Sequence, residues 1–301
     1  MANIGIHVKL DSRSSLDNAI AADHKNYGLR VAQIFTHGPR SMVKNSYDSE
    51  AIRDYCSEHN ITLIVHSSYF LTPWKDDKYQ IKSVVTELLD AYETGARHLI
   101  LHLPAKLKHS EAIKIIRKIS TKVGALNTKK RAKATAVMLV LEHKAHKPYK
   151  DRNHNLSYTD SLSLQSFMAS LDTAGFGPNS KPLGVGICLD TAHMFLSNSL
   201  QGFSDEEEMT EYLDDLTDNI DMIRVVHFNG AYNGHGSGKD KHTIPFSHQD
   251  KIWKDDNTGA ITLINTLRNH NPDIPFVIEW NLGTNESMKR CFRKLTNLGL
   301  F

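Results

Sequence analysis

The sequence predicts an α/β protein, a single (β/α)8 barrel with its functional residues at the carboxyl ends of the strands. Two observations lead to this prediction. Eight short apolar or alternating segments recur along the 301 residues, and segments with helical periodicity separate them. Alternating strands and helices are typical of a parallel sheet with crossover helices, and eight parallel strands close into a barrel. Because such a barrel takes about 250 residues, we expect residues 1–301 to form one domain.

The expected strands are short and rich in Val, Ile and Leu, as buried parallel strands are. In chain order they are Ile4 to Lys9, Arg30 to Phe35, Thr62 to Val65, His98 to Leu101, Ala136 to Leu141, Gly184 to Leu189, Met222 to Phe228 and Pro275 to Ile278. The expected helices are Ser15 to Tyr27, Ser49 to His59, Asp77 to Gly95, Ser110 to Gly124, Thr159 to Ala174, Asp205 to Asn219, Gly259 to His270 and Glu286 to Leu295. A doubly wound open sheet is the alternative, but no Gly-rich fingerprint follows the first strand.

Composition limits the class of protein. Hydrophobic residues make up 40% and charged residues 23%, which indicates a globular chain and excludes a disordered or fibrous one. The three cysteines, Cys56, Cys188 and Cys291, lack any C-x-x-C spacing, which predicts a reducing compartment and no thiolate zinc site. No signal segment and no run of about 18 apolar residues is present. We expect a soluble intracellular monomer without a membrane partner, in the cytoplasm or the nucleus, with a viral origin left open.

Charge is unevenly distributed along the chain, although the formal net charge is only +2. Residues 106–133 contain ten Lys or Arg and one acid, whereas residues 204–221 contain nine Asp or Glu and no Lys or Arg. Such runs are usually solvated helix faces, which is the interpretation we adopt here. A phosphate-binding surface on the basic segment is the alternative.

The most informative feature is the residue type at the ends of the expected strands. Six successive apolar strands each end in a side chain that can bind a metal: His66, His102, Glu142, Asp190, His227 and Glu279. In a barrel these ends lie at the face where barrel enzymes have their active sites. His193, three residues after Asp190, and the pair Asp240 and His242 can reach the same face. A single His or Asp at a strand end usually has a structural role. Six such residues at successive strand ends are much less common by coincidence.

These nine side chains predict a site with several metal ions. Four carboxylates and five imidazoles would resist burial together unless cations were present. Nine ligands with one bridging carboxylate provide ten bonds to three ions, which leaves about two positions for a hydroxide and a phosphate oxygen. Imidazole and carboxylate without thiolate favour zinc, with manganese in part, over magnesium. Such a cluster could activate water and hydrolyse a phosphodiester.

At these residues the chain resembles the endonuclease IV family of zinc-dependent abasic-site (apurinic/apyrimidinic) endonucleases, which have a xylose isomerase-like TIM barrel. The resemblance covers essentially the whole barrel. The C-L-D-T-x-H motif at Cys188 to His193 and the D-x-H motif thirteen residues after His227 are specific. Further support comes from His66-Ser67-Ser68-Tyr69, Val140-Leu141-Glu142, His227-Phe228-Asn229 and Asp240-Lys241-His242.

The resemblance implies a DNA repair endonuclease of base excision repair. It would hydrolyse the phosphodiester 5′ to an abasic site in duplex DNA and leave a 3′-OH, with 3′-repair phosphodiesterase as a further activity. Three zinc ions are implied: one held by His66, His102 and Glu142, one by Glu142, Asp190, His227 and Glu279, and one by His193, Asp240 and His242. The implied catalytic residue is Glu142, which would bridge two ions and orient a nucleophilic hydroxide. The implied DNA-binding residues are Arg40, Tyr69 and Phe70, whose side chains would insert into the DNA at the lesion and flip out the abasic nucleotide. A missing base removes stacking, so this extrusion costs little free energy.

Three departures from the family pattern fall next to predicted ligands. Leu103-Pro104 follows His102 where the family has Pro-Gly, and His143 follows Glu142 where the family has Asn. Residues 243–246 replace a Gly-rich continuation after His242. Because no ligand is lost, these departures concern the loops that contact DNA.

Two other functions compete with the endonuclease. A sugar isomerase or epimerase on the same barrel would bind one metal ion through Glu142, Asp190 and Glu279 with one more ligand, and would leave the other predicted ligands without a role. A count of about one ion per chain would favour it over the endonuclease, which needs about three. A DNA-binding protein with a structural zinc site is the second alternative, but structural sites fill every coordination position with protein ligands.

Overall fold

The structure is a computed structural model that describes residues 3–9, 15–41, 43–147, 158–197, 205–253, 257–280 and 282–301. Eight parallel strands form a closed barrel in the order β1-β10-β7-β6-β5-β4-β3-β2, which confirms the predicted (β/α)8 fold. The barrel strands are β1 (Asn3–His7), β2 (Val31–Phe35), β3 (Thr62–His66), β4 (His98–His102), β5 (Met138–Glu142), β6 (Val185–Asp190), β7 (Ile223–His227) and β10 (Pro275–Ile278). Each overlaps one of the predicted strands.

By internal contacts the chain divides into two compact units, which we describe separately. The N-terminal unit comprises Gly5–Glu142 and Ser170–Ile187. The C-terminal unit comprises Met1–Ile4, His143–Ala169 and Cys188–Phe301. The expectation of one domain stays a prediction.

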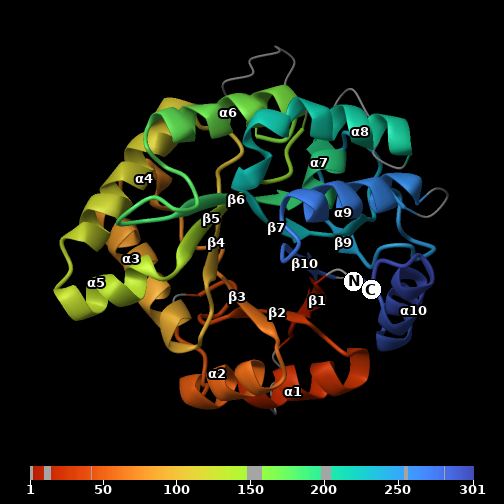
Figure 1. Ribbon diagram of the computed structural model, residues 1–301, viewed down its shortest axis with the longest axis horizontal. Helices are drawn as coiled ribbons and strands as arrows, with labels where there is room; N and C mark the ends of the chain where they lie inside the picture. The colour runs from red at the N-terminus through yellow and green to blue at the C-terminus, as the bar shows by residue number, and fades with distance from the viewer. Residues whose placement is uncertain are drawn as a thin grey trace. The chain divides into compact units, whose positions relative to one another are not determined.

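In the N-terminal unit, β2 to β5 pair with one another in sequence order, and Gly5–His7 of β1 pairs with β2. The register places His102 opposite Glu142, so that β4 and β5 end at the same level. Helices cover the outer face of these strands (Figure 1). They are α1 (Leu16–Tyr27), α2 (Ser49–Glu58), α3 (Lys78–Glu93), α4 (His109–Gly124) and α5 (Thr128–Thr135), with a 3-10 turn, η1 (Pro73–Lys75).

In the C-terminal unit, β7 and β10 are neighbours, and the long connection between them contains a short antiparallel pair, β8 (Gly230–Ala231) and β9 (His242–Thr243). Helices α8 and α9 pack against each other (Figure 1). The helices are most of α6 (Ser161–Thr173), α7 (Thr191–Ser197), α8 (Glu206–Asp215), α9 (Thr258–His270) and α10 (Asn285–Asn297), with the 3-10 segment η3 (Thr217–Met222). The Trp253 and Phe228 rings stack inside this unit, with centroids 5.5 Å apart.

Two helices were not predicted from sequence. Helix α5 contains Lys, Arg and Ala, which favour helix, but only Ala134 is buried, so no apolar period marks it. Helix α7 is fully buried and begins directly after β6, so its apolar residues extend the apolar run of the strand. The predicted start of the fifth strand at Ala136 was therefore wrong, because Ala136 caps the C-terminus of α5.

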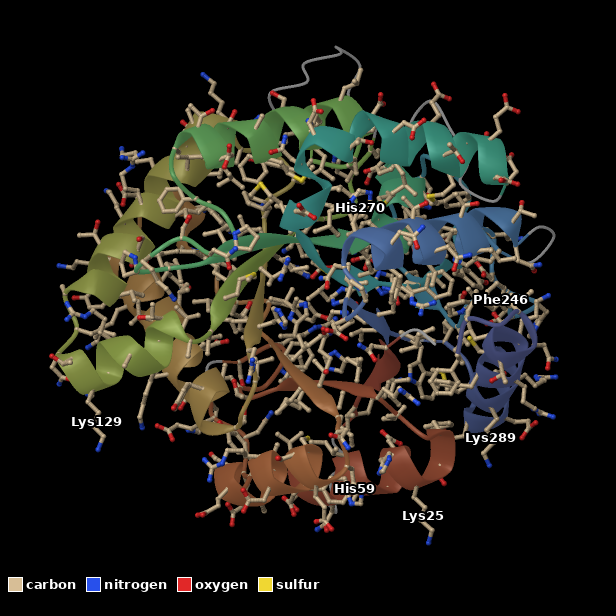
Figure 2. The ribbon with its side chains drawn as sticks, in the orientation of Figure 1. Lys25, His59, Lys129, Phe246, His270 and Lys289 are labelled. Carbon is tan, nitrogen blue, oxygen red and sulfur yellow. The ribbon has the colours of Figure 1, made fainter. Side chains whose placement is uncertain are left out.

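The basic segment lies on the outer surface of the N-terminal unit. In α4 the apolar residues Ile115, Ile116 and Ile119 are buried, whereas Lys114 and Lys118 are exposed and lie within 4.0 Å of Asp76. Lys129 of α5 points outward, away from the strands (Figure 2). These contacts favour the interpretation as a solvated helix face. No helix among the described residues is long and apolar enough to span a membrane.

Candidate metal centre

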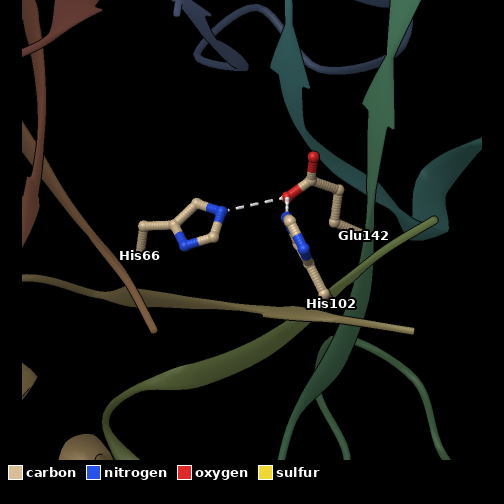
Figure 3. Close-up of side chains that lie close together, drawn as sticks. All are labelled: His66, His102 and Glu142. Atoms are coloured by element: carbon tan, nitrogen blue, oxygen red, sulfur yellow. Dashed lines mark hydrogen bonds and ion pairs between the residues drawn. The ribbon is translucent and has the colours of Figure 1, made fainter. Parts of the chain in front are cut away.

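The N-terminal unit holds one group of predicted ligands at the ends of three adjacent strands. His66 ends β3, His102 ends β4 and Glu142 ends β5. Nε2 of His102 lies 2.8 Å and Nε2 of His66 lies 3.2 Å from the same Glu142 oxygen, Oε2 (Figure 3). The side chain of Glu142 is 0% exposed and that of His66 is 1% exposed. The register pairs His102 with Glu142 and His66 with Ile100, two residues before His102. Because residues two apart in a strand face the same side, the three side chains point to one side of the sheet and meet at Glu142.

The environment of this first group is aromatic. The Phe35 ring lies 5.1 Å from that of His66, and the Tyr69 ring lies 5.5 Å from His66 and 5.3 Å from His102, centroid to centroid. His66 donates from Nδ1 to the main-chain oxygen of Ser67 at 2.8 Å. A proton held on Nδ1 leaves the Nε2 lone pair of a neutral imidazole directed at Glu142, which is the tautomer a metal ligand needs.

The C-terminal unit brings His193, Asp240 and His242 together. Nε2 of His193 lies 3.3 Å from Asp240 Oδ2 and 3.3 Å from Nε2 of His242, and the latter lies 2.9 Å from Asp240 Oδ1. His193 donates from Nδ1 to the main-chain oxygen of His143 at 2.7 Å, so its Nε2 lone pair also faces the group. The Asp240 side chain is 50% exposed. This group therefore has one side open to solvent.

A third set of predicted ligands lies in the same unit. His227 ends β7, and its Nδ1 lies 3.6 Å from Asp190 Oδ2 and 3.4 Å from Glu279 Oε2. Asp190 and His227 are fully buried. Asp190 also lies 3.8 Å, through Oδ2, from Nε2 of His242, which links this set to the preceding one.

The connection after β7 is folded back so that Asp240 and His242 return to the site. Its short strands β8 and β9 pair, with Ala231 opposite His242. Asp250, which is fully buried, accepts hydrogen bonds from the main-chain N–H groups of Ala231, Phe246, Ile252 and Trp253 at 2.8 to 3.3 Å. A Cβ at Gly230 would lie 2.7 Å from Asp250 Cγ, so only glycine allows this approach. Asp250 thus closes the loop that carries two predicted ligands.

Electrostatics in this loop are dominated by the neighbouring opposite charges. Burial alone lowers the pKa of His242, but the carboxylates of Asp190 and Asp240 outweigh burial and raise it to about 9. Burial alone raises the pKa of Asp240, but the His193 and His242 imidazoles outweigh burial and hold it far below its usual range. Without cations His242 therefore favours its protonated form beside the carboxylates of Asp190 and Asp240.

The donor set fits borderline divalent metal ions such as zinc. Three groups of buried His, Asp and Glu side chains, each with ligand atoms within 4.8 Å of one another, are consistent with several metal ions. The donors are imidazole nitrogens and carboxylate oxygens, and the buried cysteines Cys56, Cys188 and Cys291 belong to none of the groups. Buried carboxylates in this number are stabilised by cations.

The family model described as "Xylose isomerase-like TIM barrel" matches residues 21–295, which is most of the chain. The chain belongs to this family. A protein of African swine fever virus (isolate Pig/Kenya/KEN-50/1950), named "Probable AP endonuclease", is 25% identical over 287 residues, which are 92% of this chain and 88% of that protein.

Two solved structures of the same fold cover almost the whole chain. The crystal structure of AsfvAP:AG superposes with a TM-score of 0.77 at 22% identity, over 99% of this chain and 98% of the other. The crystal structure of endonuclease IV from Thermus thermophilus superposes with a TM-score of 0.72 at 20% identity, over 98% and 99% of the two chains. Together the matches confirm the resemblance to the endonuclease IV family that the motifs indicated.

The residues expected to contact DNA lie on neighbouring loops of the N-terminal unit. Tyr69 and Phe70 are 39% and 55% exposed, and Arg40 is also exposed. The main-chain N–H of Tyr69 donates to the oxygen of Pro39 at 2.9 Å, which joins the loop of Arg40 to that of Tyr69. The structure thus brings the three residues together, and their contact with DNA stays a prediction.

Two residues beside the ligands received no role from the sequence. The His143 ring accepts, at Nε2, the main-chain N–H of Asp190 at 3.4 Å, where the family has an Asn. Asn229 bonds to Asp190 and to the main chain of Glu279. The sequence gives only a weak signal for the role of Asn229, which lies two residues after a strand-end His. Its partners lie 39 and 50 residues away in the chain and are not recognisable from the sequence.

Proposed function

We propose that this protein is an endonuclease that hydrolyses the phosphodiester 5′ to an abasic site in duplex DNA and leaves a 3′-OH, using three zinc ions. One observation carries the proposal: eight of the nine predicted ligands form three groups that could each hold a metal ion, and the ninth, Asp240, lies within 3.3 Å of His193 and His242. The named relatives, a probable AP endonuclease and an endonuclease IV, support the substrate. Some of the zinc positions could hold manganese.

In this proposal Glu142 joins the two sets of ligands. Its Oε2 lies within 3.2 Å of Nε2 of both His66 and His102, and the resemblance implies Glu142 as a ligand shared with the set of Asp190, His227 and Glu279. Bound ions would lower the pKa of a water molecule and stabilise the departing 3′ oxygen. Glu142 would hold the attacking oxygen in place, which is why we assign it the catalytic role.

The remaining site residues supply binding and access. Asp240, half exposed, leaves the group of His193 and His242 open to a phosphate oxygen. The exposed Tyr69 and Phe70 would fill the space of the missing base, and the exposed Arg40 would contact the DNA phosphates. The expected monomer and the expected intracellular location stay predictions.

The decisive experiment measures metal content and cleavage on one preparation. Elemental analysis of the purified protein should give about three ions per chain. A duplex oligonucleotide with one abasic site should be cut 5′ to the lesion, and Glu142→Gln and Asp190→Asn should lose this activity. Equal activity in these variants would refute the assignment of the site.

The same measurement tests the sugar isomerase or epimerase. That function needs about one ion per chain and leaves His66 and His102 without a role. A count near one, together with an intact abasic duplex, would favour the isomerase. Three ions with no cleavage of any DNA would favour the DNA-binding protein with a structural metal site.

A further inference from the structure

The side chain of Asn229 contacts three different predicted ligand residues. Asn229 lies two residues after the end of β7 and is 0% exposed. Its Nδ2 donates to Asp190 Oδ2 at 2.8 Å and lies 3.2 Å from His242 Nδ1. Its Oδ1 accepts the main-chain N–H of Glu279 at 2.7 Å. Every polar atom of this side chain therefore serves a residue of the candidate metal centre.

The orientation of the amide is determined by its partners. The main-chain N–H of Glu279 can only donate, so the atom facing it must be the amide oxygen. The carboxylate of Asp190 can only accept when ionised, so the atom facing it must be the amide nitrogen. An amide rotated by 180° would break both bonds, so its two partners determine which atom is oxygen and which is nitrogen.

The main chain of Asn229 has a separate, structural role. Its N–H donates to Thr191 Oγ1 at 2.9 Å, and its oxygen accepts from Thr191 Oγ1 at 2.7 Å and from Trp253 Nε1 at 3.1 Å. These bonds do not involve the side chain and are available to any residue except proline at this position. A substitution of the side chain thus removes the contacts to the ligands and leaves the scaffold contacts in place.

We propose that Asn229 is a positioning residue that fixes Asp190 for metal binding. The other Asp190 oxygen, Oδ1, accepts the main-chain N–H of His193 at 2.8 Å, so each carboxylate oxygen accepts an N–H that helps to set its direction. Oδ2 also faces Nδ1 of His227 at 3.6 Å. Without Asn229 the carboxylate loses this donor on the side that faces His227, and its direction is less constrained. The inference rests on the proposed metal centre.

The test measures zinc affinity apart from catalysis. Metal-free wild type and Asn229→Ala are titrated with zinc in competition with a chromophoric chelator, and melting temperatures are measured without metal. Hydrogen-bonded partners of metal ligands typically contribute about 10- to 100-fold in affinity. In Asn229→Ala we expect the chelator to remove one ion at a concentration at least about tenfold lower than in wild type. For cleavage of abasic DNA, kcat should fall and KM should stay unchanged. Asn229→Ser, whose hydroxyl is too short to reach Asp190, replaces the alanine variant if that variant fails to fold.

Two comparisons separate positioning from general destabilisation. Tyr212→Phe removes another buried hydrogen bond of the C-terminal unit, from Tyr212 Oη to Thr159 O, and should keep wild-type zinc affinity. In the Asp190→Ala background, Asn229→Ala should weaken zinc binding by less than about twofold, since its target is gone. An equal loss in both backgrounds, or wild-type affinity in the single variant, overturns the inference while the proposed function stands. A wild-type chain that binds no zinc overturns both.

Discussion

The two units hold ligands of the same chemistry in different ways. In the N-terminal unit, His66, His102 and Glu142 end three paired strands, and the rings of Phe35 and Tyr69 lie beside the two histidines. In the C-terminal unit, Asp240 and His242 come from a long connection that Asp250 and its four main-chain hydrogen bonds hold in place. The ends of paired strands carry the first group, whereas two ligands of the second depend on a loop with its own hydrogen-bond network.

The largest expected effect comes from removing one ligand of each group. His66→Ala and His193→Ala should each lower the bound metal by about one ion per chain and reduce abasic-DNA cleavage by more than about 100-fold. The reason is that loss of a ligand should exceed the roughly 10- to 100-fold cost of losing a hydrogen-bonded partner of a ligand. Elemental analysis measures the bound metal, and single-turnover kinetics measures the cleavage rate. Glu207→Gln, an exposed acid on α8, is the control. If His193→Ala kept full metal content, the second group would not bind an ion of its own.

The difference between the units also explains what the sequence could predict. The strand spans and the strand-end ligands follow from apolar runs and from the rule that parallel strands end at one face. Asp250 and Asn229 could not be assigned in this way, because their partners are main-chain groups or ligands distant in sequence. Helices α5 and α7 lacked an apolar period of their own. The hydrogen-bond network of the second group therefore needed coordinates.

A second prediction tests the network itself. Asp250→Ala leaves the main-chain N–H groups of Ala231, Phe246, Ile252 and Trp253 without their acceptor, and should lower the free energy of unfolding by about 2 kcal/mol. Because the loop carries Asp240 and His242, one zinc ion should also bind more weakly. Urea unfolding and the zinc titration measure the two effects. Retention of all ions at wild-type affinity would show that the loop keeps its position without Asp250.

A third prediction concerns a buried acid in the N-terminal unit. Burial raises the pKa of Glu87, which is 1% exposed, to about 8, and its titratable neighbours include His37, 3.7 Å away, and Asp90. The folded chain then holds a proton that the unfolded chain releases near pH 4.5, so this residue's contribution to stability is lost as pH rises toward 8. Glu87→Gln should remove the loss.

The measurement is the free energy of unfolding in urea at pH 5 and at pH 8 for both proteins. Wild type should lose at least about 1 kcal/mol more than Glu87→Gln between these values. Comparing the two proteins cancels the contribution of His37, because His37 titrates in both. Burial lowers the pKa of His37, and the carboxylate of Asp90 opposes this shift only in part. Parallel pH profiles would show that Glu87 is charged in the folded chain across this range.

The smallest expected effect tests the aromatic surroundings of the first group. Tyr69 contacts the His66, His102 and Phe35 rings and is still 39% exposed, so its ring can both support the ligands and face DNA. Tyr69→Phe keeps the ring and should change cleavage and zinc affinity by less than about twofold. Tyr69→Ala loses stacking worth about 1–3 kcal/mol per base and should raise KM for the abasic duplex several-fold, while the number of zinc ions stays the same. Loss of an ion in Tyr69→Ala would instead mean that the ring is part of what holds His66 and His102, and that aromatic packing in this unit does the work that hydrogen bonds do in the other.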